Sequence, residues 1–164
     1  MPTLFAQPYN IDATGFYFDT FGDYQDGVKN CFDTFGFPVE EFEIQFIDGD
    51  DLDYQLYRAW GVYQSNIEPY LQAVDDLDDH TKIALIAMSE CGYDIDENTD
   101  TDDVTIYYCD TLKDLAFQFV EEGVFGTIPK SLEPYIDYDA IARDLGFDYS
   151  ELTLADQIII FRCP

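Results

Sequence analysis

The chain contains very few basic residues. Its 164 residues include 7 lysines and arginines and a single histidine, against 35 aspartates and glutamates. The formal net charge of −28 at pH 7 is repelled by nucleic acid and by anionic lipid surfaces. We therefore expect no nucleic acid and no membrane among its partners.

Catalytic and metal-binding motifs are also scarce. A Ser/His/Asp or Cys/His arrangement would have to use His80, and its sequence neighbours favour a solvated helix position. The chain has no P-loop and no Gly-x-Gly-x-x-Gly. Residues 94–100 match an EF-hand loop at its first, third and fifth positions, but Thr99 and Thr105 replace the required glycine and glutamate. We interpret this segment as an acidic connector and expect no enzyme activity, cofactor or metal site.

Long apolar runs are absent. None approaches the roughly 18 residues that cross a bilayer, and the first residues lack the basic and apolar regions of a secretory signal. The four cysteines are far apart and form no Cys-x-x-Cys pair. Without an export signal, free buried thiols are favoured over disulfides. We expect a cytoplasmic protein.

Hydrophobic residues are nevertheless abundant. They make up 47% of the chain, with 14 phenylalanines and 13 tyrosines. Excess charge accompanies disorder where apolar surface is too small to offset chain entropy, but these aromatics can form a buried core. A folded protein that tolerates such self-repulsion keeps its charge for a purpose, and a basic partner is the simplest one.

The charge is spread evenly along the chain. Residues 1–65 carry a net charge of −10, residues 66–100 carry −9, and residues 101–164 carry −9. An acidic tail is therefore excluded, and the charge must cover a folded surface. At one negative charge per 1.7 Å of duplex axis, 28 charges correspond to roughly 48 Å of DNA. A folded chain of this size has a diameter near 40 Å, so its charge per length is comparable to that of a duplex.

Hydrophobic periodicity predicts an α+β fold. Apolar residues at helical spacing predict helices over residues 23–35, 51–63, 66–77, 79–91, 111–122 and 138–145, with a short helix opening at Pro129 and a C-cap at Gly92. Runs of β-favouring residues predict strands over residues 3–7, 15–19, 41–48, 104–109 and 158–162.

These elements suggest an elongated chain of three small subdomains. Residues 1–50 read as a sheet plus one helix, residues 51–100 as a helical subdomain, and residues 101–164 as a sheet plus helices. The polar connector at residues 94–103 is the clearest boundary.

Acidic residues on the predicted outer faces are candidates for contact with a basic partner. These candidate acids are Glu40, Glu41, Glu43, Asp50, Asp51, Asp53, Asp75, Asp76, Asp78, Asp79, Asp94, Asp96, Glu97, Asp114, Glu121 and Glu122.

The segment at residues 128–145 carries a distinctive motif. It contains Tyr-Ile-Asp-Tyr at residues 135–138, then Asp139, Ala142 and the tripeptide Arg-Asp-Leu at residues 143–145. This run, preceded by Phe-Val-Glu-Glu-Gly at residues 119–123, resembles the C-terminal signature of the ArdA antirestriction proteins. The motif residues are Leu132, Tyr135, Ile136, Asp137, Tyr138, Asp139, Ala142, Arg143, Asp144 and Leu145.

The resemblance implies a fold and a function. Members of that family are strings of three small subdomains that form elongated, curved homodimers. Their acidic surface imitates bent duplex DNA and occupies the DNA groove of type I restriction-modification enzymes. The likeness covers most of the chain but is most specific in residues 128–145, and the N-terminal third departs from it most.

The motif itself has two interpretations. Tyr135, Ile136, Tyr138, Ile141, Ala142 and Leu145 form a predicted apolar helix face, with Asp137, Asp139 and Asp144 pointing outward. We favour a packing role, within the third subdomain or at a dimer contact, in which Arg143 pairs with an acid of its own chain. The alternative is direct contact with the target enzyme.

Three hypotheses for the whole chain remain. The first is a DNA mimic that inhibits type I restriction-modification enzymes as a homodimer. The second is an inhibitor of another basic partner, such as a nucleoid protein or another DNA-binding defence protein. The third is an acid-rich domain adapted to high salt.

Overall fold

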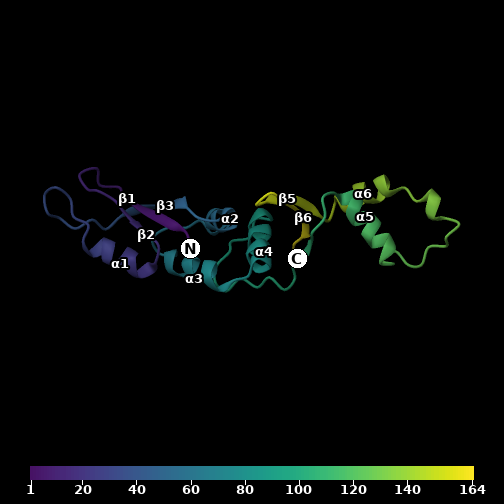
Figure 1. Cartoon of the computed structure of the whole chain (residues 1–164), viewed down its shortest axis with the longest axis horizontal. Coiled ribbons are helices and arrows are strands. Elements are labelled where there is room, and N and C mark those ends of the chain that lie inside the picture. Colours follow the sequence, from purple (N-terminus) through teal and green to yellow (C-terminus); the bar gives the residue numbers. More distant parts are fainter. The chain divides into compact units, whose positions relative to one another are not determined.

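The computed structural model describes residues 1–164 and has the predicted α+β fold, with six α-helices and two antiparallel three-stranded sheets (Figure 1). The chain divides into two compact units, Met1–Thr101 and Asp102–Pro164. The further division of the first unit near residue 50 stays a prediction.

The first unit begins with a sheet of strands β1 (Thr3–Pro8), β2 (Phe16–Phe18) and β3 (Phe42–Asp48), in the order β2-β1-β3. Side chains alternate between the two faces of the sheet, which buries Leu4 and Ala6 of β1. Gly15 precedes β2 at a close approach, since a Cβ there would lie 2.3 Å from the carbonyl oxygen of Ala6. The three predicted strands of this region are confirmed.

Helix α1 (Phe21–Lys29) packs against β2, and its predicted span of 23–35 was wrong at both ends. It begins earlier because the Thr20 hydroxyl accepts a hydrogen bond from the backbone N–H of Asp23. It ends earlier because Asp33 Oδ1 accepts hydrogen bonds from the backbone N–H groups of Phe35 and Phe37, which forms a turn in place of a helix.

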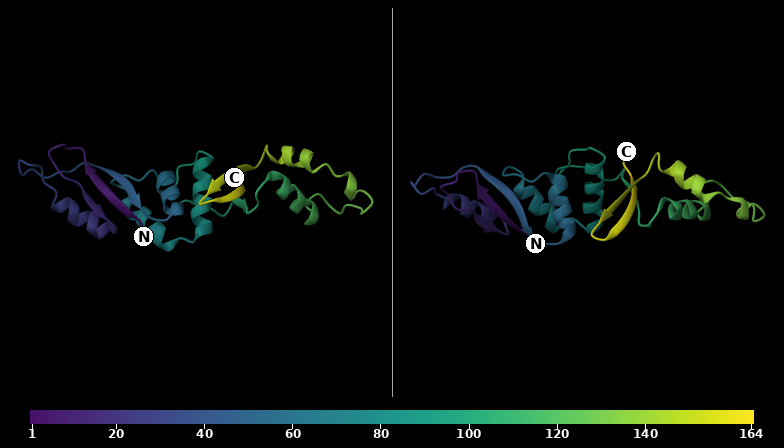
Figure 2. Two further views of the ribbon diagram at one scale, coloured as in Figure 1. Left: turned by 45° about the horizontal axis from the view of Figure 1, so that its top comes forward. Right: turned by 90° about the horizontal axis from the view of Figure 1, so that it is seen from above.

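Three helices complete this unit: α2 (Asp51–Trp60), α3 (Ile67–Asp76) and α4 (Asp79–Glu90). Helix α2 packs against both α3 and α4 (Figure 2). It stops before its predicted end because Gly61 adopts a left-handed conformation with φ of 59°. Gly92, with φ of 89°, terminates α4 as predicted.

The second unit contains strand β4 (Thr105–Tyr107), helix α5 (Leu112–Glu121), a 3₁₀ turn η1 (Glu133–Tyr135), helix α6 (Tyr138–Leu145) and the hairpin of β5 (Ser150–Leu154) and β6 (Gln157–Arg162). Its sheet has the order β4-β6-β5. Strand β5 was not predicted. The prediction of a short helix opening at Pro129 was wrong, since the only helical turn in this segment is η1, which contains Pro134.

The core of the second unit lies between its sheet and its helices. Leu115 and Phe119 of α5 pack against Ile160 of β6, and all three are buried. Half-buried side chains surround them, including Leu145 of α6 and Tyr149. The motif helix is therefore anchored to this core by Leu145.

The four cysteines are free thiols, as expected, but the expectation that they are buried holds only for Cys31, since Cys91 is exposed and Cys109 and Cys163 are half-buried. No helix is both long enough and apolar enough to cross a bilayer.

Candidate acidic interface

The candidate acids of the first sheet lie at its solvent side. Glu43 occupies an exposed position of β3 between the buried side chains of Phe42 and Ile44. Glu40 and Glu41 precede the strand and are also exposed. Alternation along the strand therefore holds the Glu43 carboxylate in solvent while Phe42 and Ile44 form the core.

A second acidic group lies where α3 is joined to α4. Asp75, Asp76, Asp78 and Asp79 are all exposed. Asp78 caps α4, and its Oδ1 accepts a hydrogen bond from the backbone N–H of Thr81 at 2.8 Å. This bond holds the pKa of the Asp78 carboxyl below its ordinary value. The charge of Asp78 therefore persists to lower pH than that of an unbonded aspartate.

The candidate acids around α2 and in the connector are exposed with one exception. Asp50 and Asp51 begin α2 in solvent, and Asp94, Asp96 and Glu97 lie on the surface of the connector. In the connector, Asp96 Oδ1 accepts a hydrogen bond from the backbone N–H of Asn98 at 2.8 Å. No group of three or more histidine, cysteine, aspartate or glutamate side chains is placed to hold a metal ion.

Asp53 is the exception, and its prediction as a surface acid was wrong. The residue is only 4% exposed, and its Oδ1 lies 2.8 Å from the Nζ of Lys82. A carboxylate that is buried and neutralised in this way cannot contact a partner. The pair ties α2 to α4 within the first unit.

The second unit carries the remaining candidate acids on α5 and its end. The Thr111 hydroxyl caps α5 by accepting a hydrogen bond from the backbone N–H of Asp114, and it donates one to the Asp114 carboxylate. Glu122 accepts a hydrogen bond from the side-chain amide of Gln118 at 2.8 Å. Glu121, like these two acids, is exposed.

The motif residues are divided between the 3₁₀ turn and α6. Asp137 caps α6, since its Oδ1 accepts a hydrogen bond from the backbone N–H of Ala140 at 3.0 Å. The ring of Tyr138 stacks on that of Phe117, with centroids 3.8 Å apart. Asp139 pairs with Lys113 of α5 at 2.9 Å. These contacts fasten α6 to α5.

Other motif residues face solvent. Leu132 is exposed, and Tyr135 is 82% exposed, so the expectation that Tyr135 belongs to an apolar helix face was wrong because it lies in the 3₁₀ turn before α6. Ile136, Ala142 and Leu145 are half-buried, whereas Asp144 is exposed. Arg143 is exposed and takes part in no ion pair, so its expected pairing with an acid of its own chain was also wrong.

Exposed apolar side chains accompany the motif in the second unit. Val124 and Phe125 follow α5, Phe147 follows α6, and each is more than half exposed, as are Leu132 and Tyr135. Large apolar side chains that are this exposed are candidates for contact with another protein.

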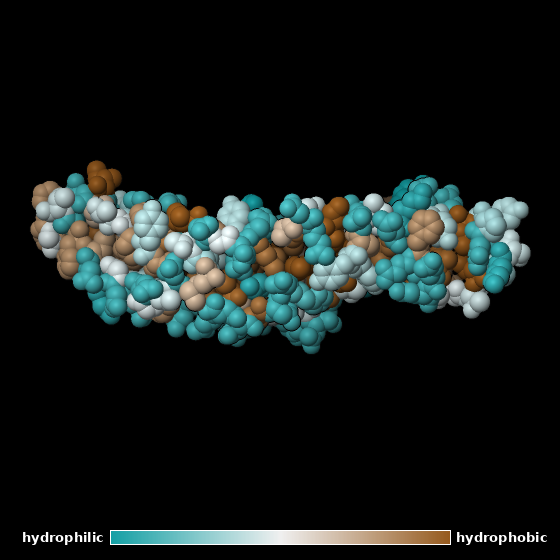
Figure 3. All heavy atoms as spheres, viewed as in Figure 1, coloured by the Kyte–Doolittle hydropathy of each residue, from teal (hydrophilic) through white to brown (hydrophobic).

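The first unit also exposes apolar residues at the loop end of its sheet, and their exposure was not predicted. Tyr9, Ile11, Phe32, Phe35 and Phe37 are each more than half exposed. Figure 3 shows hydrophobic residues gathered on this end, while hydrophilic residues cover much of the visible surface. Tyr9 and Ile11 lie in the connection between β1 and β2. Phe32, Phe35 and Phe37 lie at the turn of Asp33, for which an aspartate three residues before a glycine was the available signal.

Comparison with known proteins gives one family. The family model described as antirestriction protein (ArdA) matches residues 17–157. The match includes most of β2, all six α-helices and the whole motif segment. No curated protein matches the chain.

Proposed function

Because the chain belongs to the ArdA family of antirestriction proteins, we propose that it inhibits type I restriction-modification enzymes by occupying their DNA-binding groove as a mimic of duplex DNA. In this role it is an inhibitor that acts in the cytoplasm and performs no catalysis. Its partner is the basic DNA groove of the methyltransferase core.

The observation that carries the proposal is that the acidic side chains of this chain, a member of the ArdA antirestriction family, are exposed on its surface. Apart from Asp53, every candidate acid is exposed, and the chain has only 7 lysines and arginines against 35 acidic side chains. Exposed carboxylates are the groups that can replace phosphates against lysine and arginine side chains. Each contact is weak, and the sum of many contacts with release of counterions provides the affinity.

We further propose that the active form is a homodimer joined through the apolar residues exposed beside the motif. Phe147 and Tyr135 are 84% and 82% exposed, which is unfavourable for large aromatic rings in water. Covering them with a second copy removes that apolar surface from solvent and leaves the acids free for the target.

The test is competition for DNA. A purified type I restriction-modification enzyme is bound to a labelled duplex that contains its recognition site, and the protein is added at increasing concentration. We expect displacement of the duplex near stoichiometric amounts, and an apparent affinity that falls at least about tenfold between 50 and 200 mM salt. Light scattering on the same samples should give twice the mass of one chain. DNA binding that is unchanged at stoichiometric excess rules out the proposal for that enzyme.

A pair of variants separates charge from shape. Asp75→Asn with Asp79→Asn removes two exposed charges at the junction of α3 and α4, while Asp75→Glu with Asp79→Glu keeps them. We expect the asparagine pair to weaken inhibition by a factor of about three to ten and the glutamate pair to leave it nearly unchanged. Equal inhibition by the two pairs would show that these carboxylates make no contact with the enzyme.

A further inference from the structure

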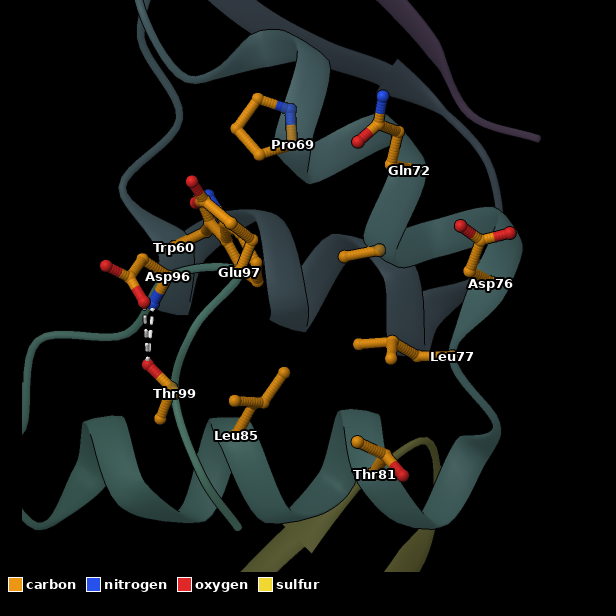
Figure 4. A pocket seen from close by; sticks show the side chains of 11 residues that line it. Trp60, Pro69, Gln72, Asp76, Leu77, Thr81, Leu85, Asp96, Glu97 and Thr99 are labelled. Atoms are coloured by element: carbon orange, nitrogen blue, oxygen red, sulfur yellow. Dashed lines mark hydrogen bonds between the residues drawn. The ribbon is translucent and has the colours of Figure 1, made fainter.

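The first unit contains a cavity that inhibition through many exposed surface charges does not require. It lies between α2, α3, α4 and the connector, has a volume of about 200 Å³, and is drawn in Figure 4. Its walls are mainly apolar and include Trp60 of α2, Ala73 of α3 and Leu85 of α4. In Figure 4, Leu77 and Leu85 point toward the open space.

The rim of the cavity is acidic. Asp76 of α3 and Asp96 and Glu97 of the connector line it, and all three are exposed. Asp96 is held by its hydrogen bonds from the backbone N–H of Asn98 and the hydroxyl of Thr99. No basic side chain lines the cavity, so the charge of the rim is not neutralised by the residues around it.

We propose that this cavity binds the side chain of an arginine from a basic partner. The proposal rests on the proposed function only for the source of that arginine. An arginine combines an apolar stem, which suits the leucines and the alanine, with a planar cation that stacks on aromatic rings such as Trp60. Its guanidinium also forms charge-assisted hydrogen bonds to carboxylates of the kind found at the rim.

The volume fits this occupant. At roughly 30 Å³ for each water-sized group, the cavity holds about seven such groups, and an arginine side chain has about that number of non-hydrogen atoms. A purely apolar side chain would gain nothing from the negative charge of the rim, and an inorganic cation would make no use of the apolar walls.

Trp60 makes the proposal directly measurable. It is the only tryptophan in the chain and lines the cavity, so its indole N–H resonance reports on this place alone. The full chain is titrated with Nα-acetyl-arginine amide and, separately, with Nα-acetyl-norleucine amide, which has a similar stem without the cation. We expect a saturable shift of the Trp60 resonance with the arginine compound and no saturable shift with the norleucine compound.

Two exposed acids test the rim. Asp76→Asn with Glu97→Gln should weaken binding of the arginine compound about tenfold, which is about threefold for each carboxylate. The control, Asp48→Asn with Glu90→Gln, removes one aspartate and one glutamate from exposed positions of the same unit that do not line the cavity. We expect the control to change the affinity less than about twofold, because distant exposed charges are screened by salt.

A filled cavity tests the walls. Ala73→Leu places additional carbon atoms in the space and should abolish the Trp60 shift, with the circular dichroism of the folded chain retained. If this variant does not fold, the two acid pairs decide the matter. An equal response to both compounds, or an equal loss of affinity in both acid pairs, overturns the proposal.

The outcome is independent of the competition experiment. The Trp60 titration needs no restriction enzyme, so a failure here leaves the inhibition of DNA binding intact. Conversely, a chain that binds the arginine compound and displaces no DNA contradicts the proposed function alone.

Discussion

At the scale of single residues, the pair of Lys82 and Asp53 is unusual in a chain with so few basic groups. Their side chains are 9% and 6% exposed, and the hydroxyl of Tyr70 donates a hydrogen bond to the Asp53 carbonyl oxygen at 3.0 Å. Burial raises the pKa of Tyr70 far above its ordinary value, helped by the nearby Asp53 charge. The ion pair joins α2 to α4, and the Tyr70 hydrogen bond to the Asp53 backbone joins α3 to α2 at the same place inside the first unit.

We expect Lys82→Met to be strongly destabilising. It leaves the Asp53 carboxylate buried without its partner, which lowers the free energy of unfolding by about 3 to 5 kcal/mol. Lys82→Met with Asp53→Leu should recover most of this loss, because two apolar side chains then pack together. Urea unfolding followed by Trp60 fluorescence measures both variants.

Lys29→Met supplies the control for that measurement. Lys29 pairs with Asp26 at 3.0 Å on the surface, where the two side chains are 71% and 74% exposed. Exposed pairs of this kind contribute little to stability, so the urea midpoint should hardly move. A loss in Lys82→Met no larger than in Lys29→Met would refute the structural role of the buried pair.

The burial of Asp53 was open to prediction from its register. Asp53 precedes Leu56 by three positions and Trp60 by seven, which places it on the core face of α2. Its acidic neighbours Asp50 and Asp51, which are exposed, led instead to its prediction as a surface acid. The partner across the core, Lys82, lies 29 positions away in α4, and no local pattern could identify it.

At the scale of elements, the motif helix α6 depends on its cap. Asp137→Ala removes the acceptor for the Ala140 N–H and should lower the free energy of unfolding of the second unit by about 1 kcal/mol. Asp137→Ser keeps a capping oxygen but removes the charge, so its free energy of unfolding should be close to that of the parent chain. Thermal unfolding measures stability, and the DNA competition assay measures inhibition.

The same pair of variants decides between the two interpretations of the motif. If Asp137 acts by packing α6, inhibition follows stability, and only the alanine variant is impaired. If its charge contacts the enzyme, the serine variant also loses inhibition while it remains stable. The hydrogen bond to Ala140 favours the first result.

Elements with strong local signals were predictable, and the others were not. Helix α5 has an apolar stripe and a Thr111 cap with Asp114 three residues later, and it was predicted within one residue at each end. Strand β5 has the sequence Ser-Glu-Leu-Thr-Leu, which has few strongly apolar residues. It pairs only because β6 lies beside it, across a turn in which Ala155 and Asp156 have positive φ.

At the scale of the whole molecule, self-repulsion opposes folding. Unfolding separates the like charges, so added salt, which screens them, should favour the folded state. We expect the melting temperature to rise between 10 and 200 mM sodium chloride and then level off, with the chain fully folded at the lowest salt because its core is extensive. Melts followed by circular dichroism test this, and sucrose at equal osmolality is the control.

The same melts separate two of the hypotheses. A domain adapted to high salt would unfold near zero salt, and that result would favour the third hypothesis over DNA mimicry. A chain that is folded at low salt and inhibits DNA binding there is incompatible with a purely salt-adapted coat.

Four acidic residues stabilise the starts of helices: Asp23, Asp78, Asp114 and Asp137. Asp78 and Asp137 are caps themselves, and Asp23 and Asp114 accept a hydrogen bond from a capping threonine. Helix starts favour negative charge, so part of the acidity is demanded by architecture whatever the target. If the target enzyme were lost and selection then favoured a less acidic chain, the carboxylates of the strands and the connector would be replaced first, and these four aspartates would be retained longest.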